Sequence, residues 1–199
     1  IISNNSYDIT IDVIDSEHKI LMLYQNVHPD ANTLAKSLLS DTNIDFDVFS
    51  IEEENIEFNS YDLIVFSGVH SIEKLMSDQI KKSEIPLLFL SNNEVEIFKT
   101  FFENISFDLS KDFFEVRASL DSNFSSFKID KNLINQFNNG PSLSSNKIKI
   151  SGFKRPDIIF SQNVNGQTNN TPLILIEREA TSKGILLAQN FWRQRIYDY

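Results

Sequence analysis

A serine at the end of a short apolar run has the best placement in this sequence for covalent chemistry. Ser91 follows the run PLLFL at 86–90, which is typical of a buried strand, and a helix is expected to begin near Glu94. In an open parallel sheet, ligands and catalytic groups gather at the carboxyl ends of the strands, beside helix N-termini. Ser91 therefore stands where a nucleophile would be expected.

The residues that would activate Ser91 are missing from the pattern. Asn92 follows it, where a nucleophile elbow favours glycine. All three histidines precede the serine in the chain: His18, His28 and His70. A serine without a positioned base is a poor nucleophile at neutral pH. We therefore expect Ser91 to be a degenerate nucleophile position that caps a helix, with a hydrolase that recruits His28 or His70 as the alternative.

Polar residues also follow the two earlier buried runs, HKILMLY at 18–24 and YDLIVFS at 61–67. Because the carboxyl ends of parallel strands meet at one edge of a sheet, these residues are expected to form a common rim. If the domain binds a ligand, the candidate residues are Gln25, Asn26, His28, Asp30, Ser67, His70, Ser91 and Asn92.

A metal centre at this rim is the second alternative. His28, His70 and Asp30 have the side chains that zinc prefers. The two histidines lack the close helical spacing of a strong zinc motif, so we favour loop residues with Asp30 beside a helix start. No metal and no cofactor is predicted.

Other functions of α/β proteins need residues that are missing from the ends of these predicted strands. A phospho-receiver needs acidic residues after its first strand and an aspartate after its third, but QN at 25–26 and SG at 67–68 stand there. The first turn has no glycine, which excludes a P-loop or a dinucleotide fingerprint. The acidic connector at 52–54 is expected to be a solvated loop rather than a calcium site.

Composition narrows the class of partner. The net charge of −10 and the isoelectric point near 4.7 argue against binding to nucleic acid or to an anionic membrane surface. The absence of cysteine excludes thiolate catalysis, cysteine-bound metals and disulfides. No apolar run approaches the roughly 18 residues of a membrane span, and no signal peptide opens the chain. Because the first residue is Ile1, we expect a part of a longer protein.

The order of apolar runs predicts an α/β fold, doubly wound, with a mainly parallel sheet flanked by helices. Four strands alternate with helical patterns up to about residue 102, which is the signature of right-handed βαβ units. Antiparallel strands are expected in the C-terminal half, where Asn165-Gly166 is a hairpin signal. The expected strands are 18–24, 46–51, 61–67, 86–91, 113–120, 147–150, 157–162, 173–177 and 183–189.

Helices are expected from Pro29 or Asp30, from Ser71, over 95–102 and 131–137, and from Asn190 onward. In the last helix Trp192 is expected in the core, with Arg193 and Arg195 paired to acidic neighbours; anion recognition by these arginines is the alternative.

Three stretches carry a resemblance to a known family: KILMLY at 19–24 leading into HPD at 28–30, the strand that begins PL at 172–173, and the closing FWRQRIYDY at 191–199. They resemble the class I glutamine amidotransferase-like, flavodoxin-type domain. More narrowly, they resemble its non-catalytic version in large membrane-anchored bacterial envelope proteins with β-sandwich or von Willebrand A-like regions.

The resemblance implies an organisation and a setting. Residues 1–15 would be the trailing strand or linker of an upstream β domain, and residues 16–199 the amidotransferase-like domain. The domain would be a non-catalytic binding or scaffolding module in the cell envelope, on the periplasmic side. Its partners would be other domains of the parent chain or other envelope proteins, with no direct membrane contact. The oligomeric state is left open.

Overall fold

The computed structural model describes residues 17–90, 95–102, 106–153, 156–178 and 180–196. Residues 1–15, expected to be the trailing strand or linker of an upstream β domain, and the site residues Ser91 and Asn92 lie outside these residues. No helix in the described part of the chain has both the length and the apolar character to cross a bilayer.

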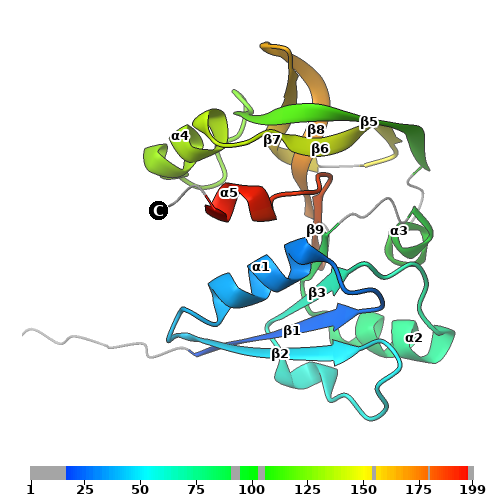
Figure 1. The fold of residues 1–199 in the computed structure, drawn as a ribbon. Helices are drawn as coiled ribbons and strands as arrows, with labels where there is room; N and C mark the ends of the chain where they lie inside the picture. Colours follow the sequence, from blue (N-terminus) through cyan, green and yellow to red (C-terminus); the bar gives the residue numbers. More distant parts are fainter. Residues whose placement is uncertain (1–16, 91–94, 103–105, 154–155, 179, 197–199) are drawn as a thin grey trace, which may run out of the picture.

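Nine strands form one sheet in the order β2-β1-β3-β4-β9-β8-β7-β5-β6 (Figure 1). The strands are β1 His18–Tyr24, β2 Ile44–Ser50, β3 Leu63–Ser67, β4 Leu87–Leu90, β5 Ser106–Leu120, β6 Leu143–Ser151, β7 Pro156–Val164, β8 Gln167–Arg178 and β9 Ser182–Leu186. The helices are α1 Pro29–Leu38, η1 Phe58–Ser60 (a 3-10 turn), α2 Lys74–Ser83, α3 Val95–Phe101, α4 Lys131–Asn139 and α5 Trp192–Ile196.

The first half of the sheet is parallel, as expected. β1 pairs with β2 and β3, β3 with β4, and β4 with β9, all in parallel. The connection from β2 to β3 differs from a regular βαβ unit, because it contains only η1 and the acidic loop instead of an α-helix. That shorter connection leaves space beside α2, where the groove described below lies.

The second half is antiparallel and is joined to the first through β9. β9 pairs in parallel with β4 on one side and antiparallel with β8 on the other. The expected hairpin turn joins β7 to β8, where Asn165 and Gly166 have φ values of 52° and 82°. Those left-handed angles are the ones that asparagine and glycine tolerate best.

Several boundaries differ from the sequence prediction. β5 runs for 15 residues instead of eight, because it pairs with β6 on both sides of a register break after Leu109 and then with β7 from Arg117 onward. α2 begins at Lys74 with Glu73 as its N-cap, so the start expected at Ser71 was wrong. β9 ends at Leu186, and the chain continues extended to a single bridge between Gln189 and Ser144.

Aromatic side chains fill one face of the parallel strands. Phe66 and Phe89 stack with 4.9 Å between ring centroids, and three phenylalanines of the α3 region close around Phe89: Phe98, Phe101 and Phe102. Each of these five is at most 4% exposed. The phenylalanines thus provide the hydrophobic burial that holds α3 against the parallel strands β3 and β4.

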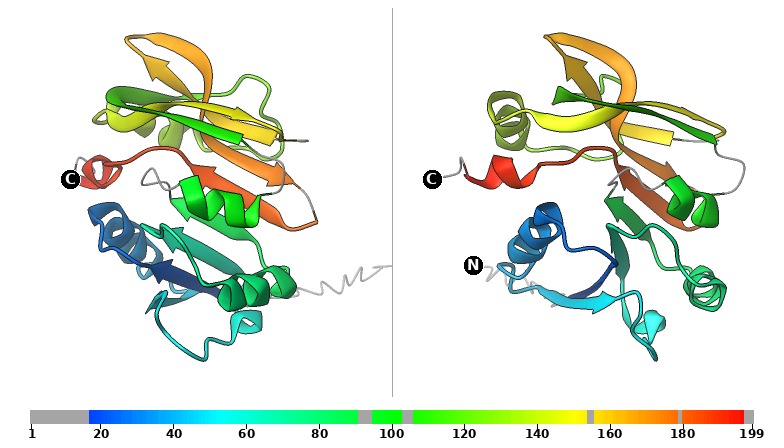
Figure 2. Two further views of the ribbon diagram at one scale, coloured as in Figure 1. Left: turned by 90° about the vertical axis from the view of Figure 1, so that its right-hand side faces the viewer. Right: turned by 45° about the vertical axis from the view of Figure 1, so that its right-hand side comes forward.

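The opposite face of the parallel strands is covered by α1 and by the chain after β9. Ala31 and Leu34 of α1 belong to the same apolar cluster as Met22 of β1 and Phe191. Phe191 also contacts the core of the antiparallel half. α5 consequently lies between α1 and the antiparallel strands, as the views in Figures 1 and 2 agree.

Candidate functional site

Two neighbouring loops at the carboxyl end of the parallel strands are tied together by polar side chains. Gln25, just after β1, accepts the backbone N–H of His70 through its Oε1 at 2.8 Å. The Asn26 side chain donates to the backbone carbonyl of Gly68 at 3.4 Å. Ser67 is 1% exposed and lies in register between Tyr24 of β1 and Leu90 of β4. The structure thus brings the loops after β1 and β3 together, and the side chains of Gln25 and Asn26 bind backbone groups of the neighbouring loop.

His28 is the N-cap of α1, a role that the sequence prediction did not give it. Its Nδ1 accepts the backbone N–H of Asp30 at 3.2 Å, which satisfies one of the open donors at the start of the helix. The same Nδ1 is 3.4 Å from Asp30 Oδ2. A nitrogen whose lone pair accepts the amide proton cannot also donate to the carboxylate. His28 therefore positions the helix start in this geometry.

Asp30 is a buried carboxylate at the rim that binds two backbone N–H groups. The residue is 2% exposed, and its two carboxylate oxygens each accept a backbone N–H from the C-terminal segment. Oδ2 accepts from Asn190 at 2.7 Å and Oδ1 from Trp192 at 2.9 Å. The first turn of α1 is thus fastened to a segment 160 residues later in the chain. Asn190 itself has a φ of 66°, which turns the backbone so that both N–H groups reach one carboxylate.

Burial and hydrogen bonding act on Asp30 in opposite directions. Burial raises the pKa of the carboxyl because it penalises the charged form, while the N–H groups of Trp192 and Asn190 lower it. The pKa of Asp30 is raised on balance. Burial of the Asp30 carboxylate costs free energy, and both N–H donors are needed to offset that cost. The two hydrogen bonds therefore form only when α1 is packed against the C-terminal segment.

The metal alternative gains no support from the geometry. Among the residues that the structure describes, no three His, Asp or Glu side chains lie together in a way that could hold a metal ion. His28 and Asp30 are engaged with each other and with backbone groups, and His70 is exposed on the neighbouring loop. The degenerate nucleophile position, Ser91, and its neighbour Asn92 lie outside the described residues.

A groove beside the rim was not predicted from the sequence. Its volume is about 690 Å³, and it lies between the loop after β2 and the first turns of α2. Its lining includes Gln25, the acidic loop 51–56, and a stripe of α2. Helical spacing would place Ile72, Leu75 and Met76 on one face with Ile80, which is buried. Leu75 is 72% exposed instead, because the short β2–β3 connection leaves no helix to cover it.

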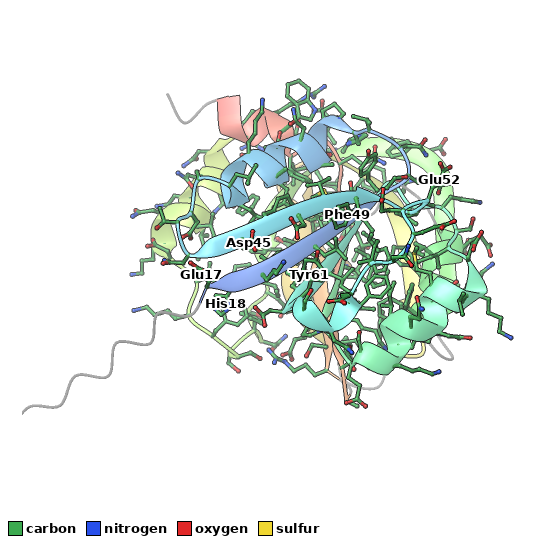
Figure 3. The ribbon with its side chains drawn as sticks, turned by 90° about the horizontal axis from the view of Figure 1, so that it is seen from below. Glu17, His18, Asp45, Phe49, Glu52 and Tyr61 are labelled. Atoms are coloured by element: carbon green, nitrogen blue, oxygen red, sulfur yellow. The ribbon has the colours of Figure 1, made fainter. Side chains whose placement is uncertain are left out.

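A second polar cluster lies at the other end of β1 and β2. Tyr61 donates its hydroxyl to Asp47 Oδ2 at 2.8 Å. Lys19 reaches Asp47 at 3.5 Å and Asp45 at 3.7 Å, and its ammonium lies 5.0 Å from the Tyr61 ring centroid. Burial, together with the adjacent Asp47 carboxylate, raises the pKa of Tyr61 to about 12. Figure 3 shows Asp45 and Tyr61 on this side of the molecule.

Of the two arginines expected to pair with acidic neighbours, Arg193 contacts an aromatic ring, and the side chain of Arg195 lies outside the described ones. The Arg193 guanidinium lies 5.7 Å from the centre of the Trp192 ring, a cation–π geometry. Trp192 is half-buried, so its expected place in the core was wrong. Gln194 next to it donates to the carbonyl of Pro141, which holds α5 against the end of α4.

Comparison with known proteins identifies a fold and no family. A scan against models of protein families finds no match for this sequence, and a search of curated proteins finds none. Among solved structures, the chain is similar to a candidate GMP synthase component from Thermoplasma acidophilum, with a TM-score of 0.54 and 13% identity. That alignment covers 90% of each chain.

A second similar structure is the exo-β-1,4-mannosidase Op5Man5 from Opitutaceae bacterium strain TAV5, with a TM-score of 0.52 and 12% identity. Here the alignment covers 88% of this chain but only 32% of the mannosidase. At these identities the likeness concerns the fold alone. It supports the α/β class of the fold.

We predict that Asp30→Asn destabilises the protein. An amide oxygen can accept one of the two N–H groups, while the amide nitrogen opposes the other, so a buried donor is left unsatisfied. The expected loss in the free energy of unfolding is about 1–3 kcal/mol, measured by urea denaturation. The matched control is Asp78→Asn on the exposed side of α2, which should change it by less than about 0.5 kcal/mol. Equal effects of the two substitutions would contradict the role given to Asp30.

Tyr61 should make stability fall at alkaline pH. The folded protein keeps the phenol proton up to about pH 12, whereas an unfolded tyrosine loses it near pH ~10. Between these values the unfolded state binds fewer protons, so the free energy of unfolding decreases as the pH rises. Tyr61→Phe should therefore lose less stability than the wild type between about pH 9 and about pH 11 in urea titrations. Parallel losses in both proteins would show that Tyr61 does not titrate as described.

Proposed function

We propose that this chain is a non-catalytic module that binds or scaffolds a protein partner at the carboxyl-end rim of its parallel sheet. The observation that carries the proposal is the engagement of the rim's polar groups within the fold. Asp30 holds two backbone N–H groups, His28 caps α1, and Gln25 bridges to the next loop. Side chains that are committed in this way cannot move protons for a substrate without breaking the packing that they support.

The sequence supplies the second argument for this proposal. No histidine follows Ser91 in the chain, and the chain has no cysteine that could replace the serine. His28, which follows the end of β1, uses its Nδ1 for the helix cap. Hydrolysis through a serine needs a base that is free to accept the hydroxyl proton, and His28 does not meet that requirement through Nδ1.

The setting of the module is also a proposal. The resemblance of KILMLY at 19–24 and FWRQRIYDY at 191–199 to envelope-protein domains supports a place in a membrane-anchored bacterial envelope protein, on the periplasmic side. The mannosidase supports the idea that such a fold occurs within a longer chain, since the aligned part is 32% of that enzyme. Partners would then be other domains of the same chain or other envelope proteins.

The experiment has two readouts on the intact protein. Glutamine and p-nitrophenyl acetate should be turned over no faster by the wild type than by Ser91→Ala. A photoreactive amino acid placed at Val27, which is 88% exposed between Gln25 and His28, should form cross-links to a partner domain or envelope protein in the host cells. The same group at the exposed Lys131 of α4, on the antiparallel half, should not form them.

Each readout can fail separately. Turnover that Ser91→Ala abolishes would overturn the non-catalytic assignment and favour the hydrolase. Cross-links that form equally from Val27 and from Lys131 would show that the rim is not the contact surface.

A further inference from the structure

The groove beside the rim combines apolar and acidic side chains in one surface. Its apolar part comes from the loop after β2, from η1 and from the start of α2, and its acidic part comes from the loop after β2 and from the N-cap of α2. The apolar lining residues are Ile51, Ile56, Phe58, Ile72, Leu75 and Met76. The acidic ones are Glu52, Glu53, Glu54 and Glu73. At about 690 Å³ the groove has the size of a ligand site.

The loop that forms one wall is held by backbone hydrogen bonds. The Ile51 N–H donates to the carbonyl of Tyr24 at 3.0 Å, which continues the ladder of β1 and β2 by one residue. The Glu53 N–H donates to the carbonyl of Ser50 at 3.0 Å and closes a turn. The wall is therefore formed before anything binds, so a ligand does not have to order it.

The negative charge of the groove is not balanced by basic side chains among the residues that the structure describes. None of the four glutamates takes part in an ion pair among the residues that the structure describes, and no lysine or arginine is among the groove's lining residues. Glu52 lies at the carboxyl end of the edge strand β2, with Asp45 further back along it (Figure 3). Asp45 is paired with Lys19, whereas the four glutamates that line the groove have no such pair within the described ranges and would attract a cationic partner.

The arrangement of the carboxylates favours a ligand with several separated charges over a single ion. No three acidic or histidine side chains in the described ranges converge closely enough to hold a metal ion. A small polyamine would satisfy the carboxylates but would leave the apolar floor uncovered. Leu75 is 72% exposed in that floor, and Ile72 and Met76 beside it are only partly buried.

We propose that this groove docks a protein segment that carries lysine or arginine side chains interleaved with apolar ones. The apolar side chains would cover Leu75 and its neighbours, and the basic ones would reach Glu52 to Glu54 on one side and Glu73 on the other. The inference rests on the proposed function, since it names the chemistry of the partner that binds next to the rim. Burial of apolar area drives the docking, and the charges select a basic segment and set its orientation.

The test uses the purified protein and short fluorescein-labelled peptides, with binding measured by fluorescence anisotropy. A peptide that alternates lysine and leucine should bind. The version with glutamate for lysine should not bind, and the version with serine for leucine should bind at least roughly tenfold more weakly. Binding of the lysine–leucine peptide should weaken as salt is added, because the glutamates are exposed.

Variants separate this groove from general attraction to an acidic protein. Glu53→Lys with Glu54→Lys should weaken binding roughly tenfold or more. The matched control, Asp78→Lys with Glu115→Lys, changes the net charge equally at exposed positions outside the groove and should leave binding nearly unchanged. Leu75→Ser, at a position too exposed to disturb folding, should weaken binding without any change in charge.

Three outcomes would overturn the inference: no binding of the lysine–leucine peptide, equal loss in the groove and control variants, or binding of calcium chloride alone that Glu53→Lys with Glu54→Lys abolishes. The proposed function fails differently. If the peptide does not bind while cross-links from Val27 still form, the groove inference is wrong and the non-catalytic module stands.

Discussion

One buried carboxylate fastens the first helix of the parallel half to the segment that follows β9. Asp30 lies in the first turn of α1 and accepts the backbone N–H groups of Asn190 and Trp192, which follow the strand that joins the parallel and antiparallel parts of the sheet. Burying a carboxylate costs free energy, and the two hydrogen bonds offset that cost only while both N–H donors stay in place. The contact therefore fixes one arrangement of α1 against the C-terminal segment.

Similar engagement of neighbouring side chains is the basis for the proposal that the rim of this sheet serves a scaffold. A catalytic rim needs side chains that can exchange protons with a substrate, whereas His28, Asp30 and Gln25 are engaged in capping and bridging. The docking surface that we propose lies in the adjacent groove, which four glutamates line together with the exposed Leu75. Charged and apolar side chains that the fold leaves at the surface are what a docking site requires.

The sequence was sufficient where the pattern is local. The strand at 18–24, the order of the first four strands, and the turn at Asn165 and Gly166 all follow from short-range apolar runs and backbone preferences. The sequence was insufficient where the interacting residues are far apart in the chain. Asp30 could be placed near a helix start, but its donors come 160 residues later, and nothing local indicates them. The exposure of Leu75 could not be predicted either, because helical spacing does not reveal that the connection before β3 lacks a covering helix.

Whether one carboxylate holds the C-terminal segment in solution can be measured directly. Amide hydrogen exchange followed residue by residue reports whether the N–H groups of Asn190 and Trp192 are bonded and shielded. We expect both to exchange far more slowly than an unstructured peptide, at rates similar to those of the adjoining strand β9. Exchange at the unprotected rate while β9 stays protected would show that the segment is not fastened to α1, and would contradict the central claim.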